Sequence, residues 1–226
     1  MKYIICDQGT PEWLQARAGA ITASEASTAR SVMSKDSPTK DADGNPVRRK
    51  GDPTAEAEKY LGSVALERIA GMPIGEPPRA WVLDRGHELE AVARRMYEDR
   101  TNQMVIESGI AKSDCDWFGY SSDGLVEEHG LIEIKCPIDP NKIFNILRTG
   151  DVSEYIDQMQ FGMWITGRQW CDFIMYVPAL ASVGNDLYVK RIERDNAFIS
   201  NLESDMVAAK RTVQRLESFA RNFKQQ

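Results

Sequence analysis

The sequence has 226 residues, enough for one domain with a sizeable hydrophobic core. Its 42% hydrophobic and 27% charged residues are ordinary for a soluble globular protein, and no apolar run approaches the roughly 20 residues of a membrane-spanning helix. The net charge of −6 argues against an extended nucleic-acid coat on the protein surface, although it allows a locally basic channel.

Cysteine and histidine usage narrows the metal chemistry that the chain can perform. The four cysteines are widely spaced with no C-x-x-C pair, and there are two histidines. The N-terminus, MKYIICDQGT, does not resemble a secretory signal, so we expect reduced thiols in a cytoplasmic protein. Any metal should be bound by carboxylates, which favours Mg²⁺ or Mn²⁺ over zinc.

The first hundred residues are predicted to be mostly helical. The expected helices cover residues 10–19, 22–32, 54–70 and 79–100. The first begins with Pro11 after the capping residue Thr10, and the second begins with the capping-box pattern Thr22-Ala-Ser-Glu25. A linker rich in proline and glycine, residues 72–78, precedes the fourth helix.

A polar, turn-rich segment over residues 34–53 is predicted to be a loop between the second and third helices. Its Asp41-Ala-Asp-Gly-Asn45 resembles a calcium loop superficially. The glycine falls one position early and the closing glutamate is missing, so we expect no calcium site there. The basic run Arg48-Arg49-Lys50 fits either a contact with phosphate or a solvated loop tip.

The remainder of the chain is predicted to alternate between strands and helices. Strands are expected over 104–112, 117–120, 125–127, 131–136, 170–177 and 187–193, and helices over 140–147, 153–165 and 196–223. Because there is no internal repeat, this order predicts one α/β domain in which helices cover a mixed sheet.

The stretch SSDGLVEEHGLIEIKCP, residues 121–137, places charged residues inside a short apolar strand. Glu133 and Lys135 are two residues apart, so their side chains point to the same face of that strand. The pair fits a salt bridge on a half-exposed strand. It also fits a binding site, since charges near a core are costly unless they are paired or bind something. Asp123, in the turn ten residues before Glu133, favours the binding site.

A carboxylate from the helix over 79–100 is a further candidate for this group. Glu90 shares a helix face with Ala93 and Tyr97, which are suited to packing inward. Glu88 lies on a face that is mostly charged and is expected to be exposed to solvent. Taken alone, Glu90 also fits an ordinary surface glutamate.

Together these residues suit metal-assisted hydrolysis of a phosphodiester, which needs a divalent ion to neutralise phosphate oxygens and acidify a water. Asp123, Glu133 and the backbone carbonyl of Ile134 offer hard oxygen ligands. Lys135 could orient or deprotonate the attacking water, and Glu90 could hold a second ion or a metal-bound water. Because adjacent carboxylates repel, we expect this site to be unfavourable without its cation.

Five segments carry a family resemblance: ARAGAITASEAS (16–27), RGHELEAVAR (85–94), SSDGLV (121–126), IEIKCP (132–137) and YIDQMQFGMWITGR (155–168). Together they resemble the phage lambda exonuclease family, also called the YqaJ viral recombinase family, within the PD-(D/E)xK nuclease superfamily. The resemblance spans about residues 11–195, although Ser122 replaces the proline that precedes the aspartate in many relatives. It implies a restriction-endonuclease-like α/β core with a mixed central sheet flanked by helices.

The resemblance also implies roles for matching residues. The implied metal-site residues are Glu90, Asp123 and Glu133 as ligands, with Lys135 as the catalytic base or the group that orients water. Tyr155 and Gln158 match positions beside the active site, and their spacing of three places them on one helix face. Without the family, Gln158 fits a glutamine on a helix surface.

Arg17 and Ser24 match an arginine and a serine that bind the 5′ phosphate in lambda-type exonucleases. Backbone N–H groups at a helix N-terminus beside an arginine also make an anion site on physical grounds. From the sequence alone, Ser24 equally fits an ordinary first-turn residue and Arg17 a surface charge.

The implied function is a Mg²⁺-dependent exonuclease, with Mn²⁺ able to substitute, that digests one strand of double-stranded DNA from a free, phosphorylated 5′ end. It would leave 3′ single-stranded DNA for phage-type recombination in a bacterial host. The implied partners are a single-strand annealing protein and two further copies of the chain in a ring-shaped homotrimer, with Arg48, Arg49 and Lys50 toward the channel.

We expect a single nuclease domain over residues 1–226. Its parts are N-terminal helices with the 5′-end pocket, the loop 34–53, a catalytic core over about 79–195 and a C-terminal helix over about 196–223. Two alternatives are an endonuclease with the same core and a non-catalytic module for DNA binding or assembly. Asp123, Glu133 and Lys135 argue against the module, because an inactive protein has no physical reason to retain a cluster of buried charges.

Overall fold

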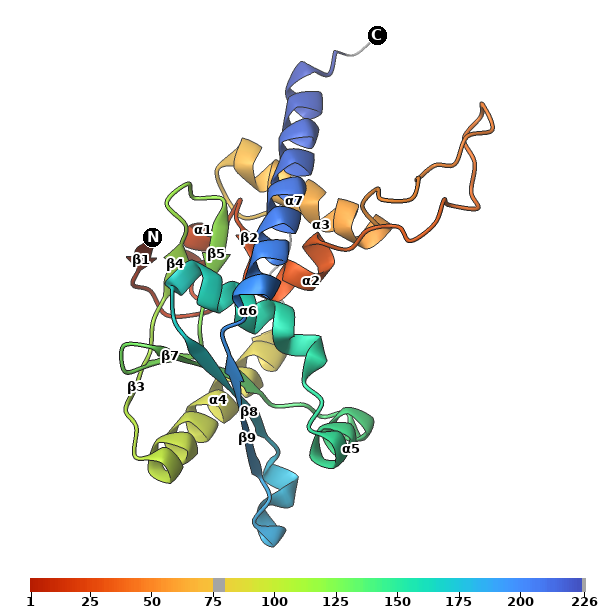
Figure 1. The fold of residues 1–226 in the computed structure, drawn as a ribbon. Coiled ribbons are helices and arrows are strands. Elements are labelled where there is room, and N and C mark those ends of the chain that lie inside the picture. Colours follow the sequence, from red (N-terminus) through yellow and green to blue (C-terminus); the bar gives the residue numbers. More distant parts are fainter. Residues whose placement is uncertain (75–79, 225–226) are drawn as a thin grey trace.

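A computed structural model of the chain describes residues 1–74 and 80–224, and the side chains of residues 80–87 are not described. The predicted linker over 72–78 therefore lies partly outside the described residues. Two mixed sheets and the helices around them build the fold (Figure 1). The expected α/β class with a mixed sheet is confirmed, and the second sheet was not expected.

The larger sheet has β7 at its centre. In spatial order its strands are β3 (Val105–Ile106), β6 (Gly124–Val126), β7 (Gly130–Lys135), β8 (Trp170–Tyr176) and β9 (Leu187–Glu193). β7 and β8 run parallel, and the other neighbours are antiparallel. Every residue of β7 except Lys135 is buried, because helices cover both faces of this sheet.

The smaller sheet joins the N-terminus to the middle of the chain. In spatial order its strands are β1 (Lys2–Ile4), β4 (Ile110–Lys112), β5 (Phe118–Tyr120) and β2 (Ile21–Thr22). The single strand expected over 104–112 is instead β3 and β4, which belong to different sheets. Gly109 lies between them, and a Cβ there would be 2.0 Å from the Ile4 carbonyl oxygen, so only glycine allows this approach.

The helices lie close to their predicted positions. They are α1 (Pro11–Arg17), α2 (Ala26–Ala29), α3 (Ala55–Ala70), α4 (Ala80–Thr101), α5 (Pro140–Thr149), α6 (Ile156–Thr166) and α7 (Asn196–Asn222), with 3₁₀ turns η1 (Ala23–Glu25), η2 (Ser153–Tyr155) and η3 (Pro178–Val183). Thr10 and Thr54 accept N–H bonds that cap α1 and α3, and Gly71 ends α3 in a left-handed conformation. Among the described helices, none is long and apolar enough to cross a membrane.

The prediction of one continuous helix over residues 22–32 is wrong. The segment is the 3₁₀ turn η1 followed by the four residues of α2. Thr22 makes no side-chain cap, because its backbone belongs to β2 and its hydroxyl accepts a bond from Arg17. The capping-box prediction is therefore also wrong.

Residues 34–53 form the predicted loop, which projects from the body of the protein as an arm (Figure 1). Two isolated bridges, Val32 to Pro53 and Lys40 to Pro46, hold its two sides together. At its base, Arg48 pairs with Glu58 of α3 at 2.5 Å. Arg48, one of the three basic residues expected to face a DNA channel, is thus neutralised by an acidic residue of the same chain.

Separate apolar clusters cover the two faces of the larger sheet. Ile132 and Ile134 of β7 pack with Ala93 and Tyr97 of α4. Leu131, on the opposite face of β7, belongs to the cluster that includes residues of α6 and α7. Strand alternation therefore places Glu133 and Lys135 on the α6 side, opposite α4.

Candidate active site

Glu133 and Lys135 meet at the C-terminal end of β7, beneath α6. Glu133 is 1% exposed, and its Oε1 accepts bonds from Lys135 Nζ and Gln158 Nε2, each at 2.6 Å. Its Oε2 is buried and has no hydrogen-bond partner among the described residues. Glu133 and Lys135 do form the salt bridge that was one of the two interpretations, but the strand is central and the carboxylate is buried, so the expected half-exposed strand is wrong.

The close approach of α6 brings Gln158 to this pair. Gly162, one turn further along α6, allows that approach, because a Cβ there would lie 2.6 Å from Tyr120 Cζ. Tyr155 precedes α6, and its ring stacks on Phe173 of β8 with centroids 5.0 Å apart. Tyr155 and Gln158 therefore lie beside Glu133 and Lys135, where the family resemblance had put them.

Asp123 lies in the turn between β5 and β6. The antiparallel register pairs Gly124 with Ile132, which brings Asp123 to the same end of β7 as Glu133. Its Oδ2 accepts the Ile134 N–H at 2.6 Å. The backbone of Ile134 is thus adjacent to both carboxylate-bearing segments.

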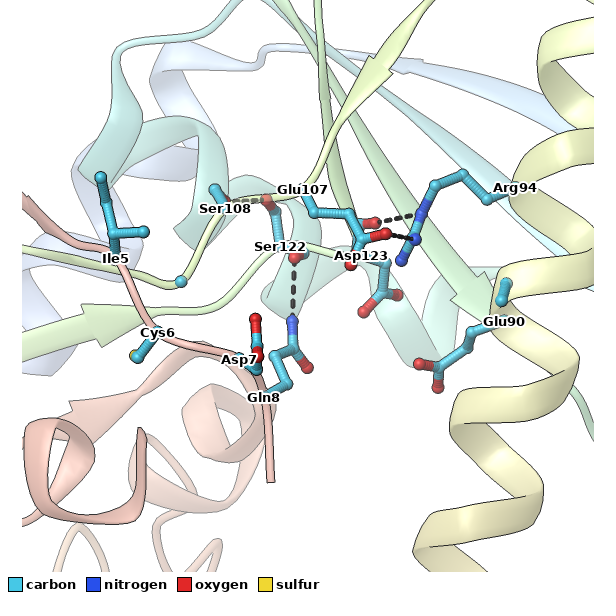
Figure 2. Close-up of a pocket in the computed structure, with 12 residues that line it drawn as sticks. Ile5, Cys6, Asp7, Gln8, Glu90, Arg94, Glu107, Ser108, Ser122 and Asp123 are labelled. Atoms are coloured by element: carbon cyan, nitrogen blue, oxygen red, sulfur yellow. Dashed lines mark hydrogen bonds and ion pairs between the residues drawn. The ribbon is translucent and has the colours of Figure 1, made fainter. Parts of the chain in front are cut away.

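Glu90 reaches this end of the sheet from α4, on the other face. Ala93 and Tyr97 are both 0% exposed, while Glu88 is exposed, so the predicted helix face is confirmed. The Tyr97 hydroxyl donates to Asp172 of β8 at 2.7 Å and anchors α4 to the sheet. Figure 2 shows Glu90 and Asp123 directed into one cavity, whose volume is about 280 Å³.

Burial sets the electrostatics of these carboxylates. It raises the pKa of Glu90 to about 7, helped by the charge of Asp123. Burial also raises the pKa of Glu133 to about 7, against the opposing effect of Lys135. For Lys135, burial alone would lower the pKa, but Glu133 and Asp123 raise it above its ordinary value. The site thus resists holding its negative charges without a further cation, and its lysine is protonated.

The donor atoms fit a hard divalent cation. Among the described residues, no three His, Cys, Asp or Glu side chains are grouped closely enough to bind one ion together. Lys135 and Gln158 hold one oxygen of Glu133, and Glu90 comes from the opposite face of the sheet. The buried Oε2 of Glu133 has no hydrogen-bond partner among the described residues, so a cation could supply the missing contact, and carboxylate and carbonyl oxygens are the ligands that Mg²⁺ prefers.

Two residues near the site were not predicted from the sequence. Lys142 of α5 has its Nζ 5.6 Å from the centre of the Tyr155 ring, and Lys135 Nζ lies 5.7 Å from the same ring. Arg94 of α4 donates from Nε to the Asp123 carbonyl oxygen at 3.1 Å. A lysine in a polar helix carries no local signal, whereas Arg94 stands one turn after Glu90 and could have been found by that spacing.

Arg17 and Ser24 do meet, at the edge of the smaller sheet. Arg17 Nη2 donates to the hydroxyls of Ser24 at 3.1 Å and Thr22 at 3.2 Å. Both partners are neutral, so these bonds leave the charge of Arg17 uncompensated. Trp13 lies under the Arg17 guanidinium at 4.9 Å, and its Nε1 donates to Ser121 Oγ at 2.8 Å, two residues before Asp123. The expected helix N-terminus is absent there, because Ser24 sits in a 3₁₀ turn.

Comparison with known proteins identifies relatives. The model of the YqaJ-like viral recombinase domain matches residues 12–169. The alkaline exonuclease LHK-Exo from Laribacter hongkongensis is 34% identical, with a TM-score of 0.75 over 94% of this chain and 97% of that chain. Its complex with dAMP matches at 32% identity over the same shares of the two chains, with a TM-score of 0.76.

A more distant relative supports the fold alone. The phage-related exonuclease from Haemophilus somnus 129PT is 17% identical, with a TM-score of 0.61 over 88% of this chain and 95% of that chain. No match was found among the curated proteins. The relatives therefore agree on one fold.

Proposed function

The chain belongs to the YqaJ-like viral recombinase family, and its similarity to an alkaline exonuclease identifies it as a nuclease. We propose that it is a Mg²⁺-dependent exonuclease of double-stranded DNA. The observation that carries the proposal is the buried Glu133, which lies beside Lys135 on the central strand and near Asp123 in the turn before β6. One of its oxygens has no hydrogen-bond partner in the part of the chain that the structure describes. A non-catalytic module would gain nothing from this arrangement, since an uncompensated buried carboxylate costs stability.

In the proposed site, Asp123, Glu133 and the Ile134 carbonyl would hold one metal ion, and Glu90 would hold a second ion or a metal-bound water. Bound there, Mg²⁺ or Mn²⁺ would neutralise charge on the scissile phosphate and lower the pKa of water. Glu133 and Asp123 raise the pKa of Lys135 above its ordinary value, so we assign its ammonium group to orienting the water and stabilising charge that develops on phosphate oxygens.

The neighbours of the catalytic pair serve to hold it in place. Gln158 fixes one oxygen of Glu133, which leaves the other oxygen for the cation. Tyr155 supplies an aromatic surface beside Lys135, and its stacking on Phe173 restrains that surface. These contacts limit the freedom of the reacting groups, as an efficient site requires.

We further propose that digestion begins at a 5′-phosphorylated end and leaves 3′ single-stranded DNA for recombination. Arg17 and Ser24 would bind the 5′ phosphate, because Arg17 is charged and its partners in the protein are neutral hydroxyls. The connection from Trp13 to Ser121 supports this placement, since it links the pocket to the turn that carries Asp123.

The proposed assembly is a homotrimer around the DNA, with a single-strand annealing protein as partner. A closed ring retains a polyanion without a basic surface, which suits a chain with a net charge of −6. Arg48 pairs with Glu58, so Arg49 and Lys50 are the better candidates for the channel. Light scattering should give about 76 kDa for three copies of the 25.4 kDa chain.

The deciding experiment compares linear and covalently closed duplex DNA in Mg²⁺. On the linear duplex, with one strand labelled at its 5′ end and the other at its 3′ end, we expect early release of the 5′ label. The closed circle, which has no ends, should stay intact. Cleavage of the closed circle would support an endonuclease instead. Failure to cleave either substrate, with Mg²⁺ or Mn²⁺, would overturn the nuclease proposal.

A further inference from the structure

Arg94 connects the helix that carries Glu90 to the turn that carries Asp123. It follows Glu90 by four residues on α4, so the two side chains share one helix face. Its Nε donates to the Asp123 carbonyl oxygen at 3.1 Å, and its Nη1 pairs with Glu107 of the segment between β3 and β4 (Figure 2). One guanidinium therefore joins three segments at the edge of the proposed metal site.

The turn that carries Asp123 is held from several directions. The Asp123 side chain accepts the Ile134 N–H, which ties the turn to β7. Ser122 accepts a bond at its carbonyl from Gln8 and shares one with Ser108 through its hydroxyl. These contacts tie the turn to β7, the N-terminal segment and the β3–β4 segment, whereas Arg94 ties it to α4.

The surroundings of Arg94 argue against a direct role in binding DNA. Its side chain is only 16% exposed, and it already pairs with Glu107. The cavity around it is lined by four carboxylates, Asp7, Glu90, Glu107 and Asp123. Without a bound cation, this excess of acidic groups disfavours contact between Arg94 itself and a DNA phosphate.

We propose that Arg94 is a positioning residue that fixes Glu90 relative to Asp123 and thereby sets the affinity of the site for a divalent cation. The inference rests on the proposed function. Glu90 and Asp123 come from different elements and repel each other, so their spacing needs a rigid connection. The guanidinium supplies it, because its planar fork donates in two fixed directions, whereas a lysine at this position could not keep both contacts.

The test measures Mn²⁺ affinity directly, by calorimetry on the full chain without DNA. Outer-shell partners of metal ligands typically change affinity by about 10–100-fold when they are removed. We expect Arg94→Gln to weaken Mn²⁺ binding by about tenfold, Arg94→Lys to weaken it less, and Glu107→Gln to weaken it least. Arg95→Gln, an exposed neighbour on α4, should bind as the wild type does.

Kinetics separate this positioning role from a general loss of structure. Raising the Mn²⁺ concentration should restore kcat in Arg94→Gln, while KM for DNA stays near the wild-type value. Unchanged Mn²⁺ affinity in Arg94→Gln would overturn the inference, as would a raised KM for DNA with normal metal binding. If Arg94→Gln does not fold, the other two variants decide: wild-type affinity in both Arg94→Lys and Glu107→Gln would overturn the inference. A wild type that binds no Mn²⁺ would overturn the proposed function as well.

Discussion

The proposed metal site and the proposed 5′-end pocket differ in how the protein holds their charged side chains. At the end of β7, Glu133 is buried, and one of its oxygens accepts bonds from both Lys135 and Gln158. Its second oxygen has no hydrogen-bond partner within residues 1–74 and 80–224 as described. At the proposed 5′-end pocket, Arg17 lies at the end of α1 and Ser24 in a 3₁₀ turn. Among the described residues, their hydrogen bonds are to neutral groups.

A functional site leaves a physical signature in the structure where its charges are buried. A buried carboxylate destabilises the fold, so its presence demands an explanation in binding or catalysis. A half-buried arginine beside a hydroxyl costs little stability, so nothing in its energetics separates a binding pocket from ordinary surface. The first region can be argued from physics, whereas the second depends on the family.

The largest loss of activity is expected from a substitution at the buried metal site. Lys135→Ala should reduce turnover by about 10²–10⁴-fold, since it removes the group that orients water and stabilises charge. Duplex binding should stay close to that of the wild type, because no metal ligand is lost. Single-turnover digestion and a binding titration in Ca²⁺ measure the two quantities, with the exposed Lys59→Ala as control. A rate near that of the wild type would remove Lys135 from the mechanism.

The next effect concerns stability without cation. A Glu133 pKa of about 7, against an ordinary 4.5, corresponds to on the order of 3 kcal/mol. The folded protein binds the extra proton between these two values, so its stability should fall as pH rises from about 5 to 7.5. Denaturation in EDTA should show this fall in the wild type and a flatter profile in Glu133→Gln.

Two additions sharpen this second test. The exposed Glu128→Gln is the matched control and should keep the wild-type profile. Adding Mn²⁺ at pH 7.5 should stabilise the wild type much more than Glu133→Gln, because binding to the native state raises its stability. Parallel pH profiles for wild type and Glu133→Gln would show that the buried charge is not a source of instability.

A smaller effect is expected at the proposed 5′-end pocket. A 5′-phosphorylated duplex should be digested faster than the same duplex with a 5′ hydroxyl. Arg17→Ala should shrink this preference by an amount worth about 1.5–3 kcal/mol at most, the range for one charge-assisted bond. Its stability should hardly change, which distinguishes this region from the buried one. Equal wild-type rates on the two substrates would exclude the anion pocket.

The buried site could be predicted from the sequence because its signals are local. The alternation of β7 placed Glu133 and Lys135 on one face, and the helical period of α4 separated Glu90 from Glu88; both placements match the structure. The roles of these residues stay predictions. Gln158 was identified only through the family, since its bond to Glu133 joins residues 25 apart.

The smaller sheet, the conformation at Thr22 and the role of Arg94 could not be predicted, because they depend on contacts that form only in the folded chain. β1 and β2 have three and two residues, and their partners β4 and β5 lie about a hundred residues away, so no local pattern marks them. The failed capping box at Thr22 has the same origin, because pairing with β5 and a bond from Arg17 replace the cap. The link from Arg94 to Asp123 likewise exists only once the sheet has formed.

The smallest expected effect tests whether the two regions are independent. Trp13 stacks under Arg17 and donates to Ser121 at 2.8 Å, two residues before Asp123. Trp13→Phe keeps a ring under Arg17 but removes this bond, whose net worth is about 0.5–1.5 kcal/mol. We expect the rate on 5′-phosphorylated DNA to fall by about two- to tenfold. The rate on DNA with a 5′ hydroxyl should hardly change, because the bond matters only when the pocket is filled. Ser121→Ala removes the same bond from the other side and should match it. Equal slowing on both substrates would instead show that Trp13 supports Asp123 regardless of the 5′ end, and the two regions would then form one site.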